Sequence, residues 1–312
     1  MSEQPDATAV SSLPPRRIAD LLATAAVLYL LPALAPSIDA GSLVANHLLS
    51  VAVTLLFTAL AVLWIAQLAP CPLTARGETL IALAAVVVWP VLIHLGSLGP
   101  VVRLYVYPLI NLLFVLLCVM CGRLLSRVLR EPNILLPVGL VAILADIFTV
   151  FMGPTGKALE VAPELVERFS VGLPEAGSAA GPEGAAGLAM LAGMGVGDFV
   201  FLALFLTAAA RFGFPLRRGG VAIIVLMCLA IVSYLMLPLL GVELPGIPLL
   251  PFIAGGFLLA YWRRFRLSPA ERQGLVWGAL LLVIILLGIM LLTHGAPSPE
   301  PSANALEGVA PE

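Results

Sequence analysis

The chain has 312 residues, of which 61% are hydrophobic and only 11% are charged. Together with a mean hydropathy of +1.09, this composition excludes an ordinary soluble domain and indicates a polytopic helical membrane protein. The formal net charge of −2 excludes no class of protein, because the charged residues are sorted by loop.

Apolar runs long enough to cross a bilayer recur along the chain between two polar tails. A transmembrane helix needs about 20 apolar residues. The tails, 1–17 and 294–312, are polar or rich in Pro, Ala and Glu, and we expect both to be disordered. The first apolar run is long for a signal peptide and is interpreted as a retained membrane helix. The sequence predicts nine transmembrane helices, at 18–38, 42–69, 79–97, 102–122, 133–152, 187–210, 219–240, 246–262 and 274–293.

These helices are expected to form three parts of an all-α polytopic membrane protein. A four-helix N-terminal region covers 18–132, a membrane core covers 133–262, and one extra helix covers 263–293. The long loop of the core, 153–186, begins with amphipathic spacing that predicts a helix lying against the bilayer surface. The second half of this loop is rich in Gly, Ala and Pro and is expected to be a flexible spacer.

The basic residues gather at alternate loops, and this predicts the orientation of the chain. Loops on the cytoplasmic side of membrane helices carry the excess of Lys and Arg. With the N-terminus inside, three basic residues fall outside: Arg103, Lys157 and Arg168. Thirteen fall inside: Arg16, Arg17, Arg76, Arg123, Arg127, Arg130, Arg211, Arg217, Arg218, Arg263, Arg264, Arg266 and Arg272. This distribution supports nine spans and a cytoplasmic N-terminus, and the compact chain suggests a prokaryotic plasma membrane.

Two acidic residues, Asp146 and Asp198, lie inside long apolar runs. A carboxylate in hydrocarbon costs at least about 2.5–3.5 kcal/mol, so an acid placed there indicates a function. The two runs follow one another in the chain, and we expect their helices to be neighbours and the acids to meet. Two carboxyl groups that share a site retain one proton between them, as in aspartic proteases. One then takes a proton from water while the other donates to the scissile carbonyl oxygen, which requires a hydrated cavity.

Three glycines precede the second acid: Gly193, Gly195 and Gly197. In a helix they leave one face without side chains, so another helix or a bound backbone can approach closely. For the glycines alone, a plain packing seam between helices is the favoured explanation. Because the glycines end on an intramembrane acid, we favour a substrate-facing role.

The residues around the two acids resemble a known family. The stretch Gly195-Val196-Gly197-Asp198-Phe199 is similar to the G-x-G-D-F motif of presenilins and signal peptide peptidases, the GxGD intramembrane aspartyl proteases. Asp146 resembles the family's first catalytic aspartate, although Ala145 stands where tyrosine is usual. Pro248-Leu249-Leu250 resembles the family's P-A-L element, with leucine in place of alanine. The resemblance covers about 133–262 and implies a presenilin-like core.

This resemblance implies an intramembrane aspartic endopeptidase that needs no cofactor or metal. Its catalytic pair is expected to be Asp146 and Asp198, and its substrates are single-pass transmembrane segments or signal peptides. Substrate binding is expected at Gly195, Gly197, Pro248, Leu249 and Leu250. The chain departs from the family in having four predicted helices before the first aspartate, where five are usual, and one after the P-A-L element, where none is usual. The arginines orient the core as in signal peptide peptidases, which predicts substrates with a cytosolic N-terminus.

Two other functions remain open at the level of sequence. Intramembrane acids also serve as proton relays, so a proton-coupled transporter or ion channel is possible, with scattered polar residues such as His47, Asn111 and Tyr234 along a path. A non-catalytic scaffold that binds membrane helices is the third reading.

The Cys118-x-x-Cys121 pair lies in an apolar run without the further ligands that a metal needs. Nothing indicates nucleic-acid binding, and the short loops suggest a protein that acts alone or as a homo-oligomer.

Overall fold

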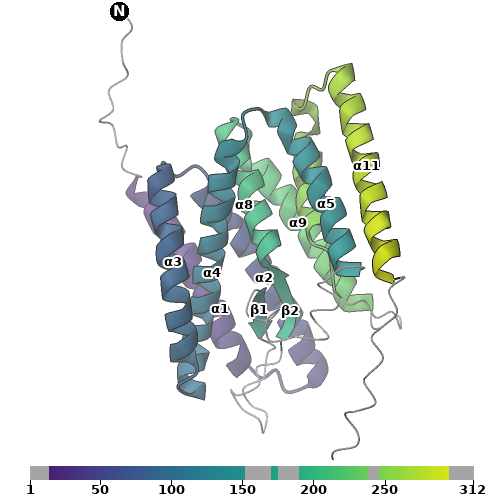
Figure 1. Cartoon of the computed structure of the whole chain (residues 1–312). Helices are drawn as coiled ribbons and strands as arrows, with labels where there is room; N and C mark the ends of the chain where they lie inside the picture. Colours follow the sequence, from purple (N-terminus) through teal and green to yellow (C-terminus); the bar gives the residue numbers. More distant parts are fainter. Residues whose placement is uncertain (1–13, 152–169, 175–189, 238–245, 295–312) are drawn as a thin grey trace, which may run out of the picture.

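The computed structural model describes residues 14–151, 170–174, 190–237 and 246–294 (Figure 1). Within these ranges the chain forms nine α-helices, several short 3-10 turns and one two-stranded sheet. The elements are α1 (Pro15–Leu34), α2 (Leu43–Leu68), α3 (Ala75–Gly96), α4 (Pro100–Val128), α5 (Leu135–Phe151), β1 (Ser170–Pro174), β2 (Met190–Gly195), α8 (Val196–Arg211), α9 (Leu216–Met236), α10 (Leu250–Tyr261) and α11 (Pro269–His294).

Each predicted membrane segment contains one of these helices, and seven helices are long and apolar enough to cross a bilayer. The chain is therefore a multi-pass integral membrane protein. The remaining two, α8 with 16 residues and α10 with 12, are shorter than a full span. The prediction of a helix from 187 is wrong for 190–195, which form strand β2.

The predicted tails and the predicted surface helix lie largely outside the described residues. The described part of the loop predicted at 153–186 is β1, a strand and not a helix.

Local sequence accounts for several helix starts. Ser42 and Thr74 accept backbone N–H bonds from the first turns of α2 and α3, and Pro100 begins α4, where a missing N–H costs nothing.

The arginine-rich helix ends lie together at one end of the bundle. Arg127 donates to the Leu73 carbonyl, and Arg211 donates to the carbonyl of Ser126. Asn133 bonds to the backbone of Arg266. These bonds join the connections before α3, α5, α9 and α11, so the helices alternate in direction as the charge pattern predicts (Figure 1).

Helix α8 occupies the centre of the packed core. Its side chains from Phe199 to Ala209 are nearly all fully buried, and α2, α4, α9, α10 and β2 pack around it. Phe257 of α10 stacks on Phe205 with ring centroids 4.9 Å apart. At the edges of the bundle, α3 and α11 stand beside α4 and α5 respectively (Figure 1). None of the apolar window of α11 is buried, so this helix faces lipid.

A buried ionic cluster fastens α3 to α4. Glu78, only 1% exposed, accepts from Arg123 Nε at 2.8 Å and from Arg127 Nε at 2.7 Å. Arg123 also donates to the carbonyls of Ala69 and Cys71, at 2.9 and 2.8 Å, and to that of Leu68. Every charge in the cluster has an opposite charge or several hydrogen bonds, as a buried ion requires. The sequence predicted only the side of the membrane on which these arginines lie, and the cluster adds a structural role.

Candidate active site

Asp198 lies in the first turn of α8. Its Oδ2 accepts the backbone N–H of Gly195, the residue that caps the helix, at 3.0 Å. A carboxylate at this position satisfies a donor that the helix cannot use and is stabilised by the positive end of the helix dipole. The sequence predicted that Asp198 lies deep within a longer helix. Because 190–195 form strand β2, the helix begins only at Val196 and Asp198 lies near its start.

Asp146 reaches the start of a different helix. It lies on α5, and its Oδ2 accepts the backbone N–H of Leu250, the first residue of α10, at 3.0 Å. The bond joins residues 104 positions apart. It therefore fixes the P-A-L-like segment against the helix that carries the first acid, which motif matching alone does not predict.

Helix α10 brings the two acids into one site. It packs against both α5 and α8. Around Gly139 of α5, Leu258 and Ala254 from α10 and Phe205 from α8 lie 3.5–3.7 Å from the place a Cβ would take. Asp146 is near enough to act electrostatically on Asp198, and both residues are partly buried. The prediction that the two acid-bearing helices are direct neighbours is wrong in detail, because α5 packs mainly on α10 and α11, and α10 contacts both α5 and α8.

The two carboxyl groups share one pattern of bonding. Each uses Oδ2 to accept a backbone N–H at the start of a helix. In the described part of the chain, Oδ1 of each has no such bond and no basic side chain pairs with either acid. The arrangement orients both groups while leaving one oxygen of each for water or a substrate.

The other predicted site residues divide into two groups. Gly195 and Leu250 touch the acids through their backbone N–H groups, and Pro248 and Leu249 lie in the segment that leads into α10. Leu249 is buried, with 3% of its surface exposed. Gly197 is exposed and makes no contact within 4 Å of its Cβ position, so it leaves open space beside Asp198.

Gly193 and Gly195 belong to strand β2, and only Gly197 lies in α8, which corrects the prediction of a bare helix face. β1 and β2 pair antiparallel, with Ser170 opposite Gly195 and Gly172 opposite Gly193. Among the described residues, each of these strands pairs with the other alone. An edge of main-chain hydrogen-bonding groups therefore ends directly at the turn that carries the second acid.

Cys118 of α4 is a neighbour of the site that the sequence did not reveal. Its side chain is 2% exposed, and the Asp198 charge reaches its thiol. Only the fold brings α4 against the first turn of α8, so no sequence signal marks this residue. In the described parts of the chain, no three His, Cys, Asp or Glu side chains are arranged to hold a metal.

Comparison of the chain with protein-family models, with curated proteins and with solved structures finds no significant match. The resemblance to the GxGD proteases therefore rests on the motif residues alone. Of these residues, Asp198 bonds to Gly195 and Asp146 bonds to Leu250.

Proposed function

We propose that this protein is an intramembrane aspartic endopeptidase that hydrolyses peptide bonds in transmembrane segments or signal peptides. The observation that carries the proposal is the pair of half-buried acids, brought together from α5 and α8 within a membrane protein. No basic side chain in the described residues neutralises them. Intramembrane acids that lack such compensation are expensive to keep and mark functional sites.

The chemistry follows from two carboxyl groups that hold one proton between them. The ionised member takes a proton from a water molecule, whose oxygen attacks the carbonyl carbon of the substrate. The protonated member donates to the carbonyl oxygen. Collapse of the tetrahedral intermediate breaks the C–N bond, and a proton passes to the leaving nitrogen. Because Asp146 and Asp198 have equivalent backbone bonds, the geometry does not assign the two roles.

The sheet beside the site suggests how a substrate is held. A transmembrane helix hides its amides in internal hydrogen bonds, so it must unwind before hydrolysis. An unwound segment can add to a sheet edge through main-chain bonds, and the pair β1–β2 ends at Gly195. Two segments are candidates for that edge. They are 153–173, of which the structure describes 170–173, and the residues before Pro248, which it describes from 246.

The arginine-rich end of the bundle supports a cytoplasmic N-terminus. The compact size of the chain supports a prokaryotic plasma membrane. In this orientation the catalytic core accepts transmembrane segments whose N-terminus is cytosolic. Cleavage of only the opposite class by protein in oriented vesicles would refute this part of the proposal.

The decisive experiment uses purified full-length protein in liposomes with a panel of single-pass transmembrane peptides. We expect cleavage at defined bonds, detected by mass spectrometry, and inhibition by a transition-state analogue of aspartic proteases. The double variant with Asp146 and Asp198 both changed to asparagine is expected to be inactive. Proton or ion flux without cleavage would instead favour the transporter or channel, and binding of peptides that survives in the double variant without cleavage would favour the scaffold.

A further inference from the structure

Five exposed arginines gather where the start of α9 meets the residues that follow α10. Two of them, Arg217 and Arg218, lie in the first turn of α9. Arg263 and Arg264 lie in the 3-10 turn Trp262–Arg264, and Arg266 follows shortly after it. These five residues are called the basic cluster below.

Buried aromatic side chains hold the two segments of the cluster together. Tyr261, the last residue of α10, donates its hydroxyl to the Pro215 carbonyl at 2.8 Å and accepts the Gly219 N–H at 3.2 Å. Phe214 packs on Tyr261 with ring centroids 4.9 Å apart and meets Phe265 edge-on at 6.3 Å. The two hydrogen bonds join residues 42 and 46 positions apart, so the fold, and not proximity along the chain, forms the cluster.

Two of the arginines are placed directly by these rings. The guanidinium carbon of Arg264 lies 6.0 Å from the centroid of the Phe214 ring. Arg218 is near enough to Tyr261 to act electrostatically on it, and it precedes Gly219, whose N–H bonds to that hydroxyl. Because Phe214 and Tyr261 pack together, a positive charge from each segment lies beside the same pair of rings.

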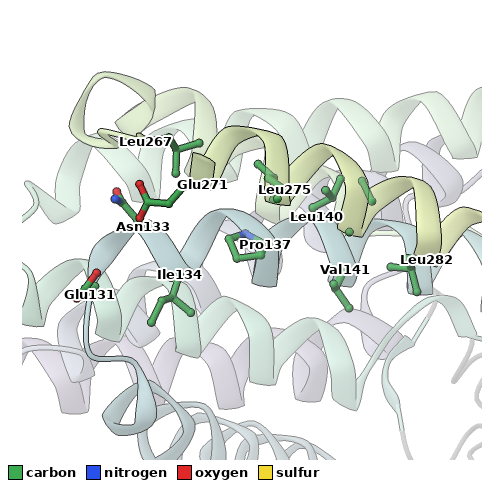
Figure 2. Close-up of a pocket in the computed structure, with 13 residues that line it drawn as sticks. Glu131, Asn133, Ile134, Pro137, Leu140, Val141, Leu267, Glu271, Leu275 and Leu282 are labelled. Atoms are coloured by element: carbon green, nitrogen blue, oxygen red, sulfur yellow. The ribbon is translucent and has the colours of Figure 1, made fainter. Parts of the chain in front are cut away.

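The basic cluster has no acid to balance it within the described residues, since none of its members forms an ion pair there. Glu131 and Glu271 lie at the same end of the bundle, but they line the groove between α5 and α11 (Figure 2). Glu271 also accepts the backbone N–H of Ser268 at 2.7 Å. The other basic group of this bundle end differs, because Glu78 balances its two arginines from within the protein.

The position of Arg217 and Arg218 is also unfavourable for α9 itself. The N-terminal end of a helix carries a partial positive charge, which repels cations and attracts anions. The first turn of α9 contains both arginines and no acid. Repulsion within the cluster and repulsion from the helix end therefore add, and a bound anion relieves both.

The surroundings place the cluster at the boundary between hydrocarbon and lipid head groups. Helix α9 is long and apolar enough to span the bilayer and begins beside the cluster. Trp262, which is 72% exposed, stands at the end of α10, and exposed tryptophan is typical of the membrane interface. Guanidinium groups can bind phosphate through two parallel N–H bonds. Groups of four to eight basic residues just cytoplasmic of a membrane helix are typical of anionic lipid binding.

We propose that the basic cluster binds the phosphate of an anionic glycerophospholipid of the cytoplasmic leaflet, which bridges the start of α9 and the end of α10. The bound lipid steadies the inner end of α10, the helix that contacts both α5 and α8 and whose first residue bonds to Asp146. The inference depends on the predicted orientation only for the leaflet, and it holds whatever reaction the acids perform.

The test uses full-length protein in nanodiscs that contain equal amounts of phosphatidylcholine and phosphatidylglycerol. Native mass spectrometry of the released protein identifies the lipids that remain bound. We expect phosphatidylglycerol to be retained about tenfold more than phosphatidylcholine, with a smaller preference when the nanodiscs are equilibrated at high salt. Equal retention of the two lipids overturns the proposal.

Matched pairs of substitutions make the test specific to the cluster. Arg218→Gln with Arg264→Gln is expected to abolish the roughly tenfold preference. Arg217→Gln with Arg263→Gln leaves Arg264 on the Phe214 ring and should also weaken the preference severalfold, so a folding defect in the first pair cannot account for the result. The unfolding midpoint in pure phosphatidylcholine checks the fold of each variant.

Arg16→Gln with Arg17→Gln is the control, because it removes the same charge from exposed arginines at the same end of the bundle. Arg17 acts electrostatically on Cys71, in the connection between α2 and α3. This pair is expected to keep the lipid preference. An equal loss in the control and in the cluster variants would show an effect of net charge alone and would overturn the proposal.

A soluble acidic partner is distinguished by adding a polyglutamate peptide to the protein in pure phosphatidylcholine nanodiscs. We expect weak binding that is the same in the unmodified protein and in the Arg218→Gln, Arg264→Gln variant. Tight peptide binding that requires these two arginines, together with no preference for phosphatidylglycerol, would overturn the proposal and assign the cluster to an acidic protein segment.

Discussion

The structure contains two sites where acids are withdrawn from water, and they are built in opposite ways. Glu78 is almost fully buried and bonds to two arginines, one of which is itself held by backbone carbonyls. Asp146 and Asp198 are partly buried, accept one backbone N–H each and are near enough to interact electrostatically. The first arrangement pairs an acid with basic side chains, whereas the second places two acids near one another with no basic partner among the described residues.

This difference separates a structural role from a chemical one. A buried ion that is fully paired can hold helices in register, but it has no free oxygen or proton to offer. A pair of acids oriented by backbone groups and lacking basic partners costs stability and remains available to react. The same change, from acid to amide, should therefore have opposite consequences at the two sites.

The largest effect is expected from Asp198→Asn or Asp146→Asn. Either change removes a proton donor or acceptor and should lower the rate of peptide cleavage about 10²–10⁴-fold. The amide oxygen can still accept the backbone bond, so thermal unfolding in detergent should be nearly unchanged. Asp39→Asn is the matched control, because Asp39 is exposed and also accepts a backbone N–H, from Gly41 at 2.9 Å. Full activity in either single variant would contradict the proposed mechanism.

Glu78→Gln should act on stability. It leaves the buried Arg123 without a counter-ion, and breaking a buried pair in this way costs about 3–5 kcal/mol, whereas the exposed Arg127 adds little. We expect a lower midpoint of thermal unfolding, measured at fixed detergent concentration, with cleavage per folded molecule largely retained. If the variant unfolded like the unmodified protein, the cluster would not be the structural clamp that its bonds indicate.

Apolar length predicted the coarse fold because the hydrocarbon core fixes how long a spanning helix must be. All nine predicted segments contain helices. The start of α8 was not predictable in this way, because the stretch Met190–Gly195 is apolar whether it forms a helix or a strand. Its glycines weaken a helix, but only pairing with β1 decides the strand.

The site was predicted in part for a similar reason. Acids inside apolar runs are a strong signal, and Asp146 lies near enough to act electrostatically on Asp198, although α10 rather than direct packing of α5 on α8 connects their helices. The bond from Leu250 to Asp146 depends on how α10 packs on α5, and no local pattern encodes it. The ionic cluster at Glu78 had only a weak signature in the amino-acid sequence. Arg123 and Arg127 are four residues apart on one helix face, at the same bundle end as Glu78 on the helix before.

Leu249→Ala sharpens the comparison at the reactive site. Leu249 is buried at the start of α10, beside the residue that bonds to Asp146, and it stands where the resembled family has alanine. Its truncation should cost about 2–5 kcal/mol of stability and enlarge the space near the acids. We expect bulkier residues to be accepted at the cleavage site, measured by competition between peptides. Leu135→Ala removes an equally buried leucine at the far end of α5 and should cost stability without changing this preference.

The smallest change, Gly122→Ala, tests whether the two acid sites are mechanically joined. Gly122 precedes Arg123 of the ionic cluster and packs on α8 just beyond Asp198. A Cβ there would lie 2.4 Å from the Val200 carbonyl oxygen and 2.8 Å from the Leu204 nitrogen. Backbone atoms cannot yield without moving a helix, so α4 and α8 must separate, at a cost of about 1–3 kcal/mol.

We expect Gly122→Ala to lower both the unfolding temperature and the cleavage rate, because the displaced helix carries Asp198. Gly220→Ala is the control, since this buried glycine of α9 has nothing within 4 Å of its Cβ position and alanine favours a helix. A fall in stability with an unchanged cleavage rate would show that the first turn of α8 holds Asp198 independently of its contact with α4. The cap from Gly195, and not the packing of the helix, would then position the second acid.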